Sequence, residues 1–264
     1  MVHDADGVDD ATMLAFARET QLSETSFIQS PAAEGATYRN RIWTVGRELP
    51  FAGHPSLGAA VAEAFVRGER SASYRQQTPA GVQALEVELR ADGRGGHAEL
   101  ECEPTEFLDE IDPARVAAIC GLETSDLHPE LRPQWVSTGV PQVVVPLVDR
   151  DALLRAHTGE AAPLAQLIAE GGGIVVYMAA VGEDGRGSAR AFFAEGPVAV
   201  EDPATGSAVG PLCAYLDHHA GISSISVEQG AQMGRPSRLE ARIDGGRAHV
   251  GGDCVIVLAG TVSL

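Results

Sequence analysis

The chain has 264 residues, enough at roughly 150 residues per domain for two small domains or one large one with a sizeable core. It carries 19 basic and 37 acidic side chains, a formal net charge of −18, and every basic side chain is an arginine. The absence of lysine excludes a lysine aldimine to pyridoxal phosphate and a Walker-type phosphate lysine, and the acidic excess argues against a general nucleic-acid or anionic-membrane surface.

The first part of the chain predicts one amphipathic helix followed by short strands. Residues 11–20 place apolar side chains on one helical face directly after Asp9 and Asp10, which suits a capped helix of about three turns. The β-rich runs at 25–29 and 38–44 are separated by turn-forming residues, and we expect both to be strands.

The segment that starts at Gly53 has an unusual composition. No charged residue occurs from there until Glu63, and Pro55 stands where a first-turn proline is favoured. A helix without charge around its whole circumference is normally surrounded by protein, so we expect a core helix. Strands are predicted at 71–77, 82–89 and 97–102, and the proline- and acid-rich stretch 103–113 is expected to be an inter-lobe linker.

The second half repeats this pattern. A short helix is expected at 113–120, helical stretches near 152 and at 162–170, and strands at 134–138, 142–147, 174–181 and 189–194. A second charge-free, small-residue segment follows at 205–216. Strands are then predicted at 224–227, 238–243, 249–251 and 255–258.

Each half therefore contains one uncharged helix followed by several strands, with the helices near 54–66 and 206–219. The simplest architecture is an α/β (α+β) fold with two pseudo-symmetric lobes, each a mixed sheet curled around its central helix. We expect an N-terminal lobe over residues 1–104 and a C-terminal lobe over 105–264, with the last strand able to return to the first lobe.

Two such helices that begin at the lobe boundary would direct their N-terminal amide groups and dipoles into a shared cleft. We therefore expect a small anionic ligand, such as a carboxylate. His54 and Asp202 stand at the two helix starts, beside glycines that allow close backbone approach.

The cysteines and histidines show no metal-binding spacing. The chain has no CxxC, HxxxH or HExxH, so we expect no metal site and no disulfide framework, and the thiols should be free and mostly buried. No apolar run reaches the roughly 18 to 20 residues of a membrane span, and the first ten residues lack the features of a secretory signal. We expect a cytoplasmic protein with neither nucleic-acid nor membrane partners.

Four strings in the chain resemble the phenazine-biosynthesis PhzF-like isomerase/epimerase family. They are LSETSF (22–27), ELPFAGHPSLGAA (48–60), EDPATGSAVGPL (201–212) and QGAQMGRPS (229–237). The resemblance spans nearly the whole chain in the right order. It implies the diaminopimelate epimerase-like fold, a homodimer, and no metal, flavin or pyridoxal cofactor. The best-known activity of the family isomerises a hydroxylated dihydro-anthranilate by moving a proton between ring carbons.

The resemblance also implies roles for individual residues. The catalytic acid/base carboxylate of the family falls on Glu24, with His54 and Asp202 as further catalytic groups. Substrate-binding positions fall on Ser23, Gly53, Gly206 and Ser207. Cysteine-based racemases of this fold place a thiol at each helix start, and since His54 and Asp202 stand there, two-thiol racemisation is not expected.

These residue types suit proton transfer on a small cyclic or amino carboxylic acid. A single carboxylate can remove a proton from one carbon and return it to another on the same face, provided that burial raises its pKa towards the working pH. Two alternatives stay open. One is a two-base epimerase that uses Glu24 and Asp202 on opposite faces of one carbon, and the other is a non-catalytic homologue that binds a small molecule.

The chain departs from the family at its N-terminus. The usual first strand and its Gly-Asn-Pro turn are missing on comparison, about 20 to 25 residues, so we expect an open sheet edge that a partner chain fills or that is left exposed. The segment Trp43-Thr44-Val45 stands where the family usually has Phe-Thr-Pro. Both differences predict altered substrate choice or lost activity.

Overall fold

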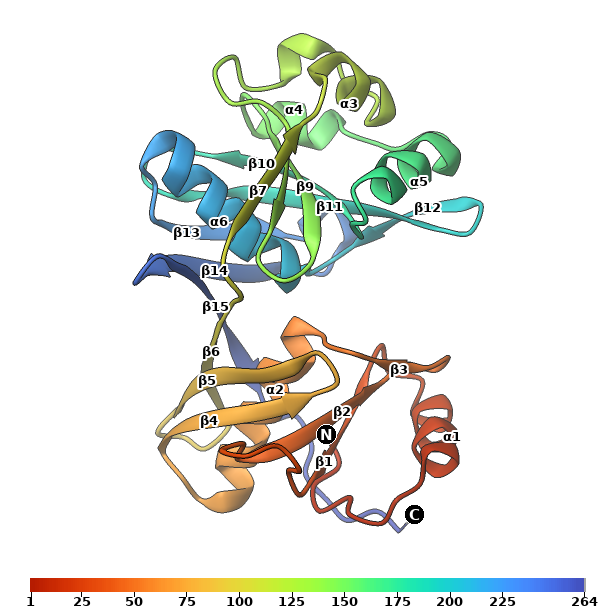
Figure 1. Ribbon diagram of the computed structural model, residues 1–264, viewed down its shortest axis with the longest axis vertical. Coiled ribbons are helices and arrows are strands. Elements are labelled where there is room, and N and C mark those ends of the chain that lie inside the picture. Colours follow the sequence, from red (N-terminus) through yellow and green to blue (C-terminus); the bar gives the residue numbers. More distant parts are fainter. Residues whose placement is uncertain (264) are drawn as a thin grey trace. The chain divides into compact units, whose positions relative to one another are not determined.

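The computed structural model describes residues 1–263, which form two compact units. The first unit comprises Met1–Glu101 and the chain from Gly251 onward, and the second comprises Cys102–Val250. Each unit contains a mixed sheet and one long helix of small, apolar residues (Figure 1). The mixed α/β fold class expected from the sequence is therefore confirmed.

The first unit is built on a sheet with the strand order β1-β2-β4-β5-β6-β15, in which β2 and β4 are parallel and β3 pairs with β2. Its elements are α1 (Asp10–Thr20), β1 (Thr25–Gln29), β2 (Tyr38–Trp43), β3 (Glu48–Leu49), α2 (Gly53–Arg67), β4 (Ser71–Thr78), β5 (Gly81–Leu89), β6 (Gly95–Glu101) and β15 (Arg247–Val255), which begins in the second unit. Helices α1 and α2 and strands β1, β2 and β4 to β6 agree with the predicted ranges to within one or two residues.

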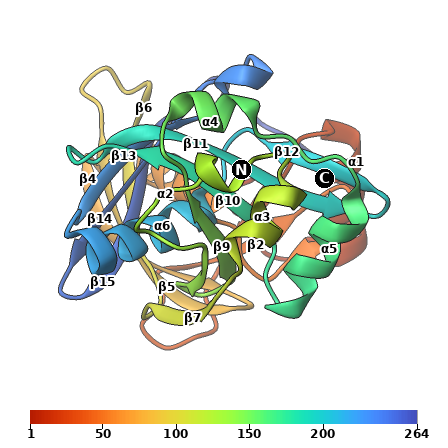
Figure 2. The same cartoon turned by 90° about the horizontal axis from the view of Figure 1, so that it is seen from above.

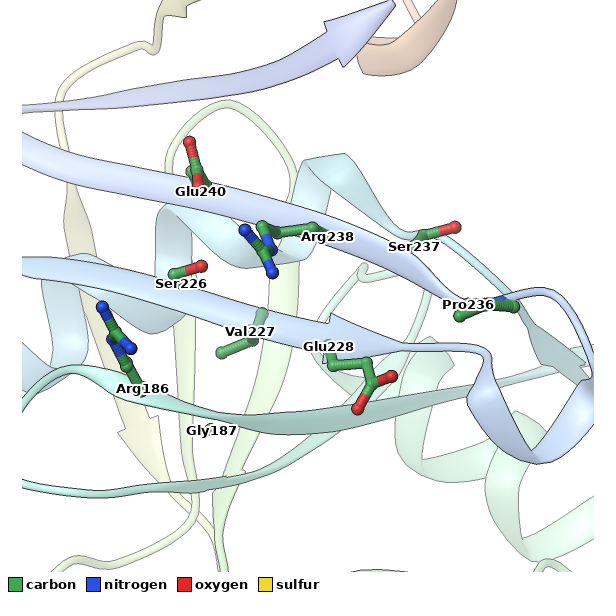
Figure 3. A pocket seen from close by; sticks show the side chains of 9 residues that line it. All are labelled: Arg186, Gly187, Ser226, Val227, Glu228, Pro236, Ser237, Arg238 and Glu240. Carbon is green, nitrogen blue, oxygen red and sulfur yellow. The ribbon is translucent and has the colours of Figure 1, made fainter.

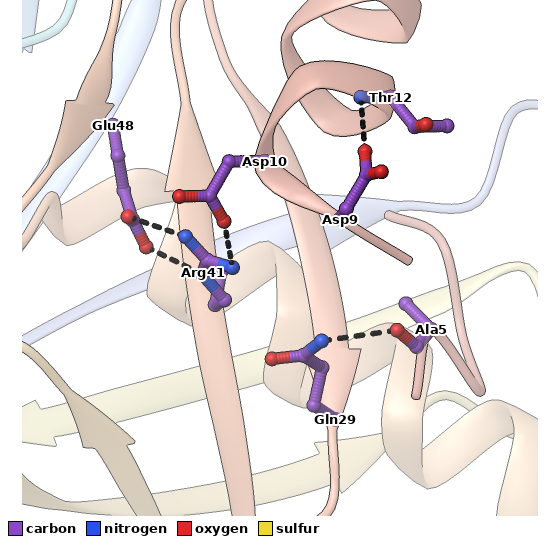
Figure 4. A network of polar contacts seen from close by, with 7 residues as sticks. All are labelled: Ala5, Asp9, Asp10, Thr12, Gln29, Arg41 and Glu48. Carbon is purple, nitrogen blue, oxygen red and sulfur yellow. Dashed lines mark hydrogen bonds and ion pairs between the residues drawn. The ribbon is translucent and has the colours of Figure 1, made fainter. Parts of the chain in front are cut away.

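Helix α1 begins at a carboxylate cap. Asp9 accepts a hydrogen bond from the backbone N–H of Thr12 at 2.8 Å (Figure 4), as the sequence pattern predicts. On the inner side of the helix, Met13 packs with Phe27 and Trp43 in a small hydrophobic cluster. The cap and this cluster fix where the chain enters β1.

A buried arginine ties α1 to the sheet from its polar side. Arg41 of β2 pairs with Asp10 at 2.8 Å and with Glu48 of β3 at 2.7 Å (Figure 4). Two carboxylates around one guanidinium compensate the cost of removing its charge from water. The start of α1 is therefore held against β2 and β3.

The expectation of an open sheet edge is wrong for the stretch of β1 that the N-terminal segment covers. Val2 forms a parallel bridge with Phe27, donates its N–H to Ser26 O at 2.7 Å and accepts from the Ile28 N–H at 2.9 Å. The N–H of Ala5 then donates to Ile28 O at 2.8 Å. These bonds satisfy backbone groups that an exposed edge would offer to another chain.

Helix α2 is buried around most of its circumference, which confirms the prediction made from its uncharged sequence. It contacts β1, β2, β4, β5 and β6. Its one carboxylate, Glu63, is fully buried, accepts a hydrogen bond from Arg67 Nε at 3.0 Å and contacts the imidazole of His3. A buried carboxylate needs such partners, because an unpaired one would be strongly destabilising.

The second unit has the strand order β15-β14-β13-β11-β10-β9-β8-β7, with β12 paired to β11 and with β9–β10 and β11–β13 parallel. Its elements are β7 (Glu106–Glu110), α3 (Pro113–Ile119), the 3-10 helix η1 (Thr124–Asp126), β8 (Gln134–Ser137), β9 (Pro141–Pro146), α4 (Arg150–Arg155), α5 (Ala161–Glu170), β10 (Val176–Val181), β11 (Arg186–Glu195), β12 (Val198–Asp202), α6 (Gly206–Ala220), β13 (Ser224–Gln229), η2 (Ala231–Met233) and β14 (Ser237–Asp244).

Helices cover the sheet of the second unit on two sides. Helices α3, α4 and α5 lie on one side of this sheet (Figures 1 and 2). Val116 of α3, Leu153 of α4 and Leu164 of α5 share one hydrophobic core with strand residues. Helix α6 contacts β8, β9, β13 and β14. At Gly210 an added Cβ would lie 3.2 Å from Thr138 Oγ1, so the small residues that predicted a core helix also allow α6 to approach the sheet closely.

A buried arginine links three elements near the end of β12. Arg190 of β11, only 8% exposed, donates to the two carboxylate oxygens of Glu201 at 2.8 and 2.7 Å. Its Nη1 donates to the carbonyl oxygens of Leu153 and Ala156, at 3.1 and 2.5 Å. This bidentate pair holds β12, and with it the segment that leads to Asp202, against β11 and α4.

Four segments differ from the sequence-based prediction. The expected linker contains a strand, β7, because Phe107 and its neighbours pair with β8. The strand β12 was not predicted, and neither was β3. The strand expected at 249–251 is part of β15, which ends at Val255, whereas most of the strand expected at 255–258 is absent, since residues 256–263 have no regular structure. Val255, Val257 and Leu258 lie largely exposed.

The thiols are free, as expected, and three of the four are buried. Burial raises the pKa of Cys120 and of Cys213 to about 12, and that of Cys254 to about 11. Among the described residues, no helix is long and apolar enough to cross a membrane.

Candidate active site

Two of the predicted catalytic residues, Glu24 and His54, meet within the first unit. Glu24 lies in the loop between α1 and β1, and His54 is the second residue of α2. His54 Nε2 lies 2.9 Å from Glu24 Oε2, and the carboxylate side chain is 18% exposed whereas the imidazole is 59% exposed. The imidazole is not aligned for an ordinary hydrogen bond, so the buried Oε2 has no well-aligned donor in the described part of the chain. Such an oxygen can accept a proton from a ligand.

The pKa of the Glu24 carboxyl is held below its ordinary value of 4.5. The His54 imidazole, as a hydrogen-bond donor, is the largest cause, since at 2.9 Å its attraction persists despite the imperfect alignment. Burial acts in the opposite direction, and the charge of His54 and the hydroxyl of Ser23 lower the pKa further. The expectation that burial raises this pKa is therefore wrong, because the imidazole outweighs desolvation. At neutral pH, Glu24 is a carboxylate.

The start of α2 has no side-chain cap. Gly53 is the first helical residue, and the residue before it, Ala52, has φ −152° and ψ 136°, the extended backbone usual at this position. An alanine side chain cannot accept a hydrogen bond. The first-turn N–H groups of α2 therefore have no side-chain cap from the position that normally supplies one.

A series of buried side-chain hydrogen bonds holds the first turn of α2 in place. Ser56 Oγ donates to Ala52 O at 2.7 Å and accepts from Gln76 Nε2 at 2.8 Å. Gln76 Oε1 in turn accepts from Asn40 Nδ2 at 2.8 Å. Because Ser56, Gln76 and Asn40 are fully buried, these bonds hold the helix start in one position relative to β2 and β4.

The remaining predicted residues lie together in the second unit. Asp202 ends β12, and Gly206 and Ser207 are the first two residues of α6. Thr205 lies between Asp202 and the start of α6. Its Oγ1 donates a hydrogen bond to Asp202 Oδ2 at 2.7 Å. Thr205 occupies the N-cap position, yet its side chain makes no capping hydrogen bond.

Two residues that the sequence analysis did not single out, Gln229 and Tyr177, complete this cluster. Gln229 Nε2 donates to Asp202 O at 2.7 Å and to Thr205 Oγ1 at 2.9 Å. Gln229 Oε1 accepts from the Thr205 N–H at 3.2 Å and from Tyr177 OH at 3.1 Å. Burial, followed by the charge of Asp202, raises the pKa of the Tyr177 hydroxyl. The one available signal was that Gln229 begins the fourth family-like string.

A separate hollow of about 570 Å³ opens beside β11, β13 and β14. Figure 3 shows its lining, with Arg186 and Arg238 on either side of Ser226, together with Glu228 and Glu240. None of the predicted site residues lines it. Ligand pockets are mostly apolar and enclosed, whereas this surface is charged and open, so we do not take it as the candidate site.

The arrangement of the His, Cys, Asp and Glu side chains shows whether the described residues could hold a metal ion. Within residues 1–263, no group of three or more His, Cys, Asp or Glu side chains is arranged to hold a metal ion. What the candidate residues offer is one ionised carboxylate beside an imidazole, and a second carboxylate beside a helix start. Both arrangements suit proton transfer and the binding of small polar acids.

Comparison with known proteins gives a consistent result. Residues 1–260 match the family model PhzC-PhzF, described as phenazine biosynthesis-like protein. The chain is 34% identical over 284 residues to an uncharacterized isomerase of Mesorhizobium japonicum, which covers 98% of this chain and 91% of that protein. It is 33% identical over 253 residues to the trans-2,3-dihydro-3-hydroxyanthranilate isomerase of Pseudomonas aeruginosa, which covers 94% of this chain and 84% of that enzyme.

Among solved structures, the fold is similar to that of a predicted epimerase from Pseudomonas aeruginosa. The TM-score is 0.77 at 30% sequence identity, and the match covers 98% of this chain and 92% of the other.

Proposed function

The chain belongs to the phenazine biosynthesis-like PhzC-PhzF family and is an isomerase or epimerase, and from this premise we propose that it moves a proton on a small cyclic or amino carboxylic acid. The resemblance seen in the four strings is confirmed, and so is the diaminopimelate epimerase-like fold class that it implied. The proposal names Glu24 as the general acid/base and requires no metal, flavin or pyridoxal cofactor.

The observation that carries the proposal is the Glu24–His54 pair. Glu24 is mostly withdrawn from solvent, ionised at neutral pH and 2.9 Å from an imidazole nitrogen. An ionised carboxylate with one poorly satisfied buried oxygen is a suitable acceptor for a proton from carbon. His54 lies beside Glu24 and can orient the substrate or exchange a proton with the Glu24 carboxylate.

In the proposed reaction, Glu24 takes a proton from one substrate carbon, and the C–H electron pair remains on the substrate as an enolate or dienolate. The protonated Glu24 then returns the proton to a second carbon, which moves a double bond and restores the carboxylate. Uncapped helix N–H groups, as at Gly53, stabilise an anionic group of the ligand. We assign Ser23, Gly206 and Ser207 to substrate binding and Asp202 to a catalytic role.

The substrate class follows the named relatives. The relative from Pseudomonas aeruginosa acts, by its name, on trans-2,3-dihydro-3-hydroxyanthranilate, a cyclic amino acid with a hydroxyl group. We propose that this chain takes an acid of that kind, with an amino or hydroxyl group near the carboxylate.

The test compares the parent protein with Glu24→Gln, which keeps the size of the side chain and removes its basicity. Removal of a general acid/base costs about 10²- to 10⁴-fold in rate. We expect kcat on trans-2,3-dihydro-3-hydroxyanthranilate, or on another cyclic amino acid of a substrate panel, to fall by that factor while the thermal unfolding temperature stays close to that of the parent. A Glu24→Gln protein with the parent's kcat contradicts the proposed role.

The second candidate is a two-base epimerase, which the similarity to a predicted epimerase favours. Turnover in deuterium oxide distinguishes the two reactions. Epimerisation by Glu24 and Asp202 labels the carbon that inverts, whereas same-face transfer by Glu24 alone returns much of the original hydrogen to the product. A parent protein that binds acids in calorimetry but turns none over would instead be a non-catalytic homologue. The homodimer and the cytoplasmic location stay predictions.

A further inference from the structure

Thr205 breaks the local rule for the start of a helix. A threonine at the N-cap usually accepts a hydrogen bond from a first-turn N–H through its hydroxyl oxygen. In this protein the residues before α1, α3 and α4 follow the rule with the carboxylates of Asp9, Asp112 and Asp149. Thr205 does not, although it occupies the same position before α6.

The hydroxyl of Thr205 is committed elsewhere. It donates to Asp202 Oδ2 at 2.7 Å and accepts from Gln229 Nε2 at 2.9 Å. With the backbone N–H of Thr205 bonded to Gln229 Oε1 at 3.2 Å, the residue is held at three points. Thr205 is 8% exposed and Gln229 is 1% exposed, so water competes little with these bonds.

Gln229 is itself fixed in one orientation. Its oxygen accepts from Thr205 and Tyr177, and its nitrogen donates to Asp202 O and to Thr205 Oγ1, so a flipped amide would place donors against donors. The next residue, Gly230, has φ +79°, and an added Cβ there would lie 2.6 Å from Pro203 O. The chain at residues 229–230 is thus fitted closely against the loop that carries Asp202.

We propose that Thr205, held by Gln229, is a positioning residue that fixes the Asp202 carboxylate for catalysis. The proposal rests on the proposed function, because it assumes that Asp202 acts on the substrate. The bond from Thr205 engages Oδ2, so the second carboxylate oxygen, Oδ1, is the one assigned to the ligand. Oδ1 can therefore accept from an N–H or O–H group of the ligand, which suits an amino or hydroxy acid.

The bond to Asp202 explains why Thr205 stands at the N-cap of α6 and yet does not cap the helix. The hydroxyl is directed to Asp202 and Gln229 and not to a first-turn N–H, so the N–H groups at the start of α6 stay without a side-chain cap. Violations of a local rule in an otherwise consistent fold are expected at functional sites. The loss of a helix cap is thus coupled to the fixed orientation of a carboxylate.

The experiment compares two substitutions at one position. Thr205→Val keeps the shape of the side chain and removes the hydroxyl, whereas Thr205→Ser keeps the hydroxyl and removes a methyl group. We expect Thr205→Val to lower kcat about 10- to 100-fold, the range found when a partner that orients a functional group is lost, with KM changed less than about threefold. Thr205→Ser should recover at least a third of the parent's kcat.

Tyr215→Phe is the matched control. Tyr215, 1% exposed, donates its hydroxyl to Arg132 O at 2.7 Å from the last turns of α6, so its substitution also removes one buried hydrogen bond in the same unit. A purely structural role for Thr205 predicts that Thr205→Val and Tyr215→Phe lower the unfolding temperature and leave kcat unchanged well below that temperature. That result overturns the proposal, as does a Thr205→Ser protein as slow as Thr205→Val.

Crystal structures of the parent and of Thr205→Val provide a readout that needs no turnover. We expect the Asp202 carboxylate to lie as described in the parent and to rotate or occupy two conformers in Thr205→Val. An unchanged, single Asp202 conformer in Thr205→Val refutes the positioning role even if the parent is active. A parent that turns over no acid, with Asp202 released in Thr205→Val, refutes the proposed function and leaves the positioning by Thr205 standing.

Discussion

Replacement of Ala52 by serine would add a hydroxyl at the position before α2, where φ −152° and ψ 136° already suit a capping residue. The N–H of His54, the second helical residue, is the donor within reach, since Pro55 at the third position has none. A serine in place of alanine at such a position stabilises a helix by about 1 kcal/mol. For a protein of this size we expect the unfolding temperature to rise by about 2 to 4 °C.

The same hydroxyl would compete with an anionic ligand for the first-turn N–H groups. A hydrogen bond to a charged group contributes about 1.5 to 3 kcal/mol, so its full loss would weaken binding roughly 10- to 100-fold. Because the serine competes for the donor and does not remove it, we expect the lower end of this range. Ala52→Ser should therefore raise KM about tenfold while it raises stability, a trade-off known for functional sites.

Helix α5 offers the matched control. Its N-cap residue, Glu160, also makes no side-chain capping bond, and Pro163 stands at its third position as Pro55 does in α2. Glu160→Ser should raise the unfolding temperature without changing KM. Differential scanning fluorimetry and steady-state kinetics on the same preparations measure both quantities. A stabilised Ala52→Ser protein with the parent's KM refutes the role of the α2 amides in ligand binding.

Three further outcomes follow from the described contacts. In His54→Ala, loss of the largest cause that lowers the Glu24 pKa leaves burial to raise it, so carbon-detected NMR should show the Glu24 titration at higher pH than in the parent. Since the parent's pKa is lowered, Glu24 contributes stability at neutral pH that is lost only as pH falls below 4.5; an unmoved titration contradicts this assignment. Arg190→Met should destabilise the second unit by about 3 to 5 kcal/mol in urea unfolding, because it leaves Glu201 with a half-buried unpaired charge, and a smaller effect for the double variant with Glu201→Leu is the check. Cys120, with its pKa raised to about 12, should react with an aromatic disulfide reagent at pH 8 only after the protein is denatured, so fast labelling of the native protein would be inconsistent with its burial.

The elements that could be predicted are those whose sequence pattern matches their surroundings. The uncharged segment after Gly53 predicted a buried helix because few environments other than a protein interior accept such a surface. The stretch 103–113 was predicted to be a linker, yet it contains strand β7, because the surroundings of this strand leave no pattern in its sequence. Strand β7 is exposed at all five positions, so its polar sequence resembles a loop, and only pairing with β8 makes it a strand.

Within the candidate site, sequence reasoning named residues inside the family-like strings and missed Gln229 and Tyr177 as partners of the Asp202 loop. Glu24 and His54 belong to strings that resemble the family, and the structure brings them to 2.9 Å. Gln229 and Tyr177 are uncharged residues on strands, and a glutamine or tyrosine in a strand has no local signature of function. Their role depends on contacts between residues 24 to 52 positions apart in the sequence. The lowered pKa of Glu24 likewise depends on a distance that the sequence does not contain.

Strand β15 has a consequence for how the polypeptide is made. The strand begins in the second unit and ends in the first, where it neighbours β6, and an added Cβ on Gly95 would lie 2.1 Å from Cys254 O. Gly251 follows Glu101 by 150 residues (251 − 101), so at about 5 to 20 residues per second the ribosome delivers this final strand roughly 8 to 30 s after the rest of the first unit. The first unit, which carries Glu24, is thus completed only after every residue of the second unit has been synthesised.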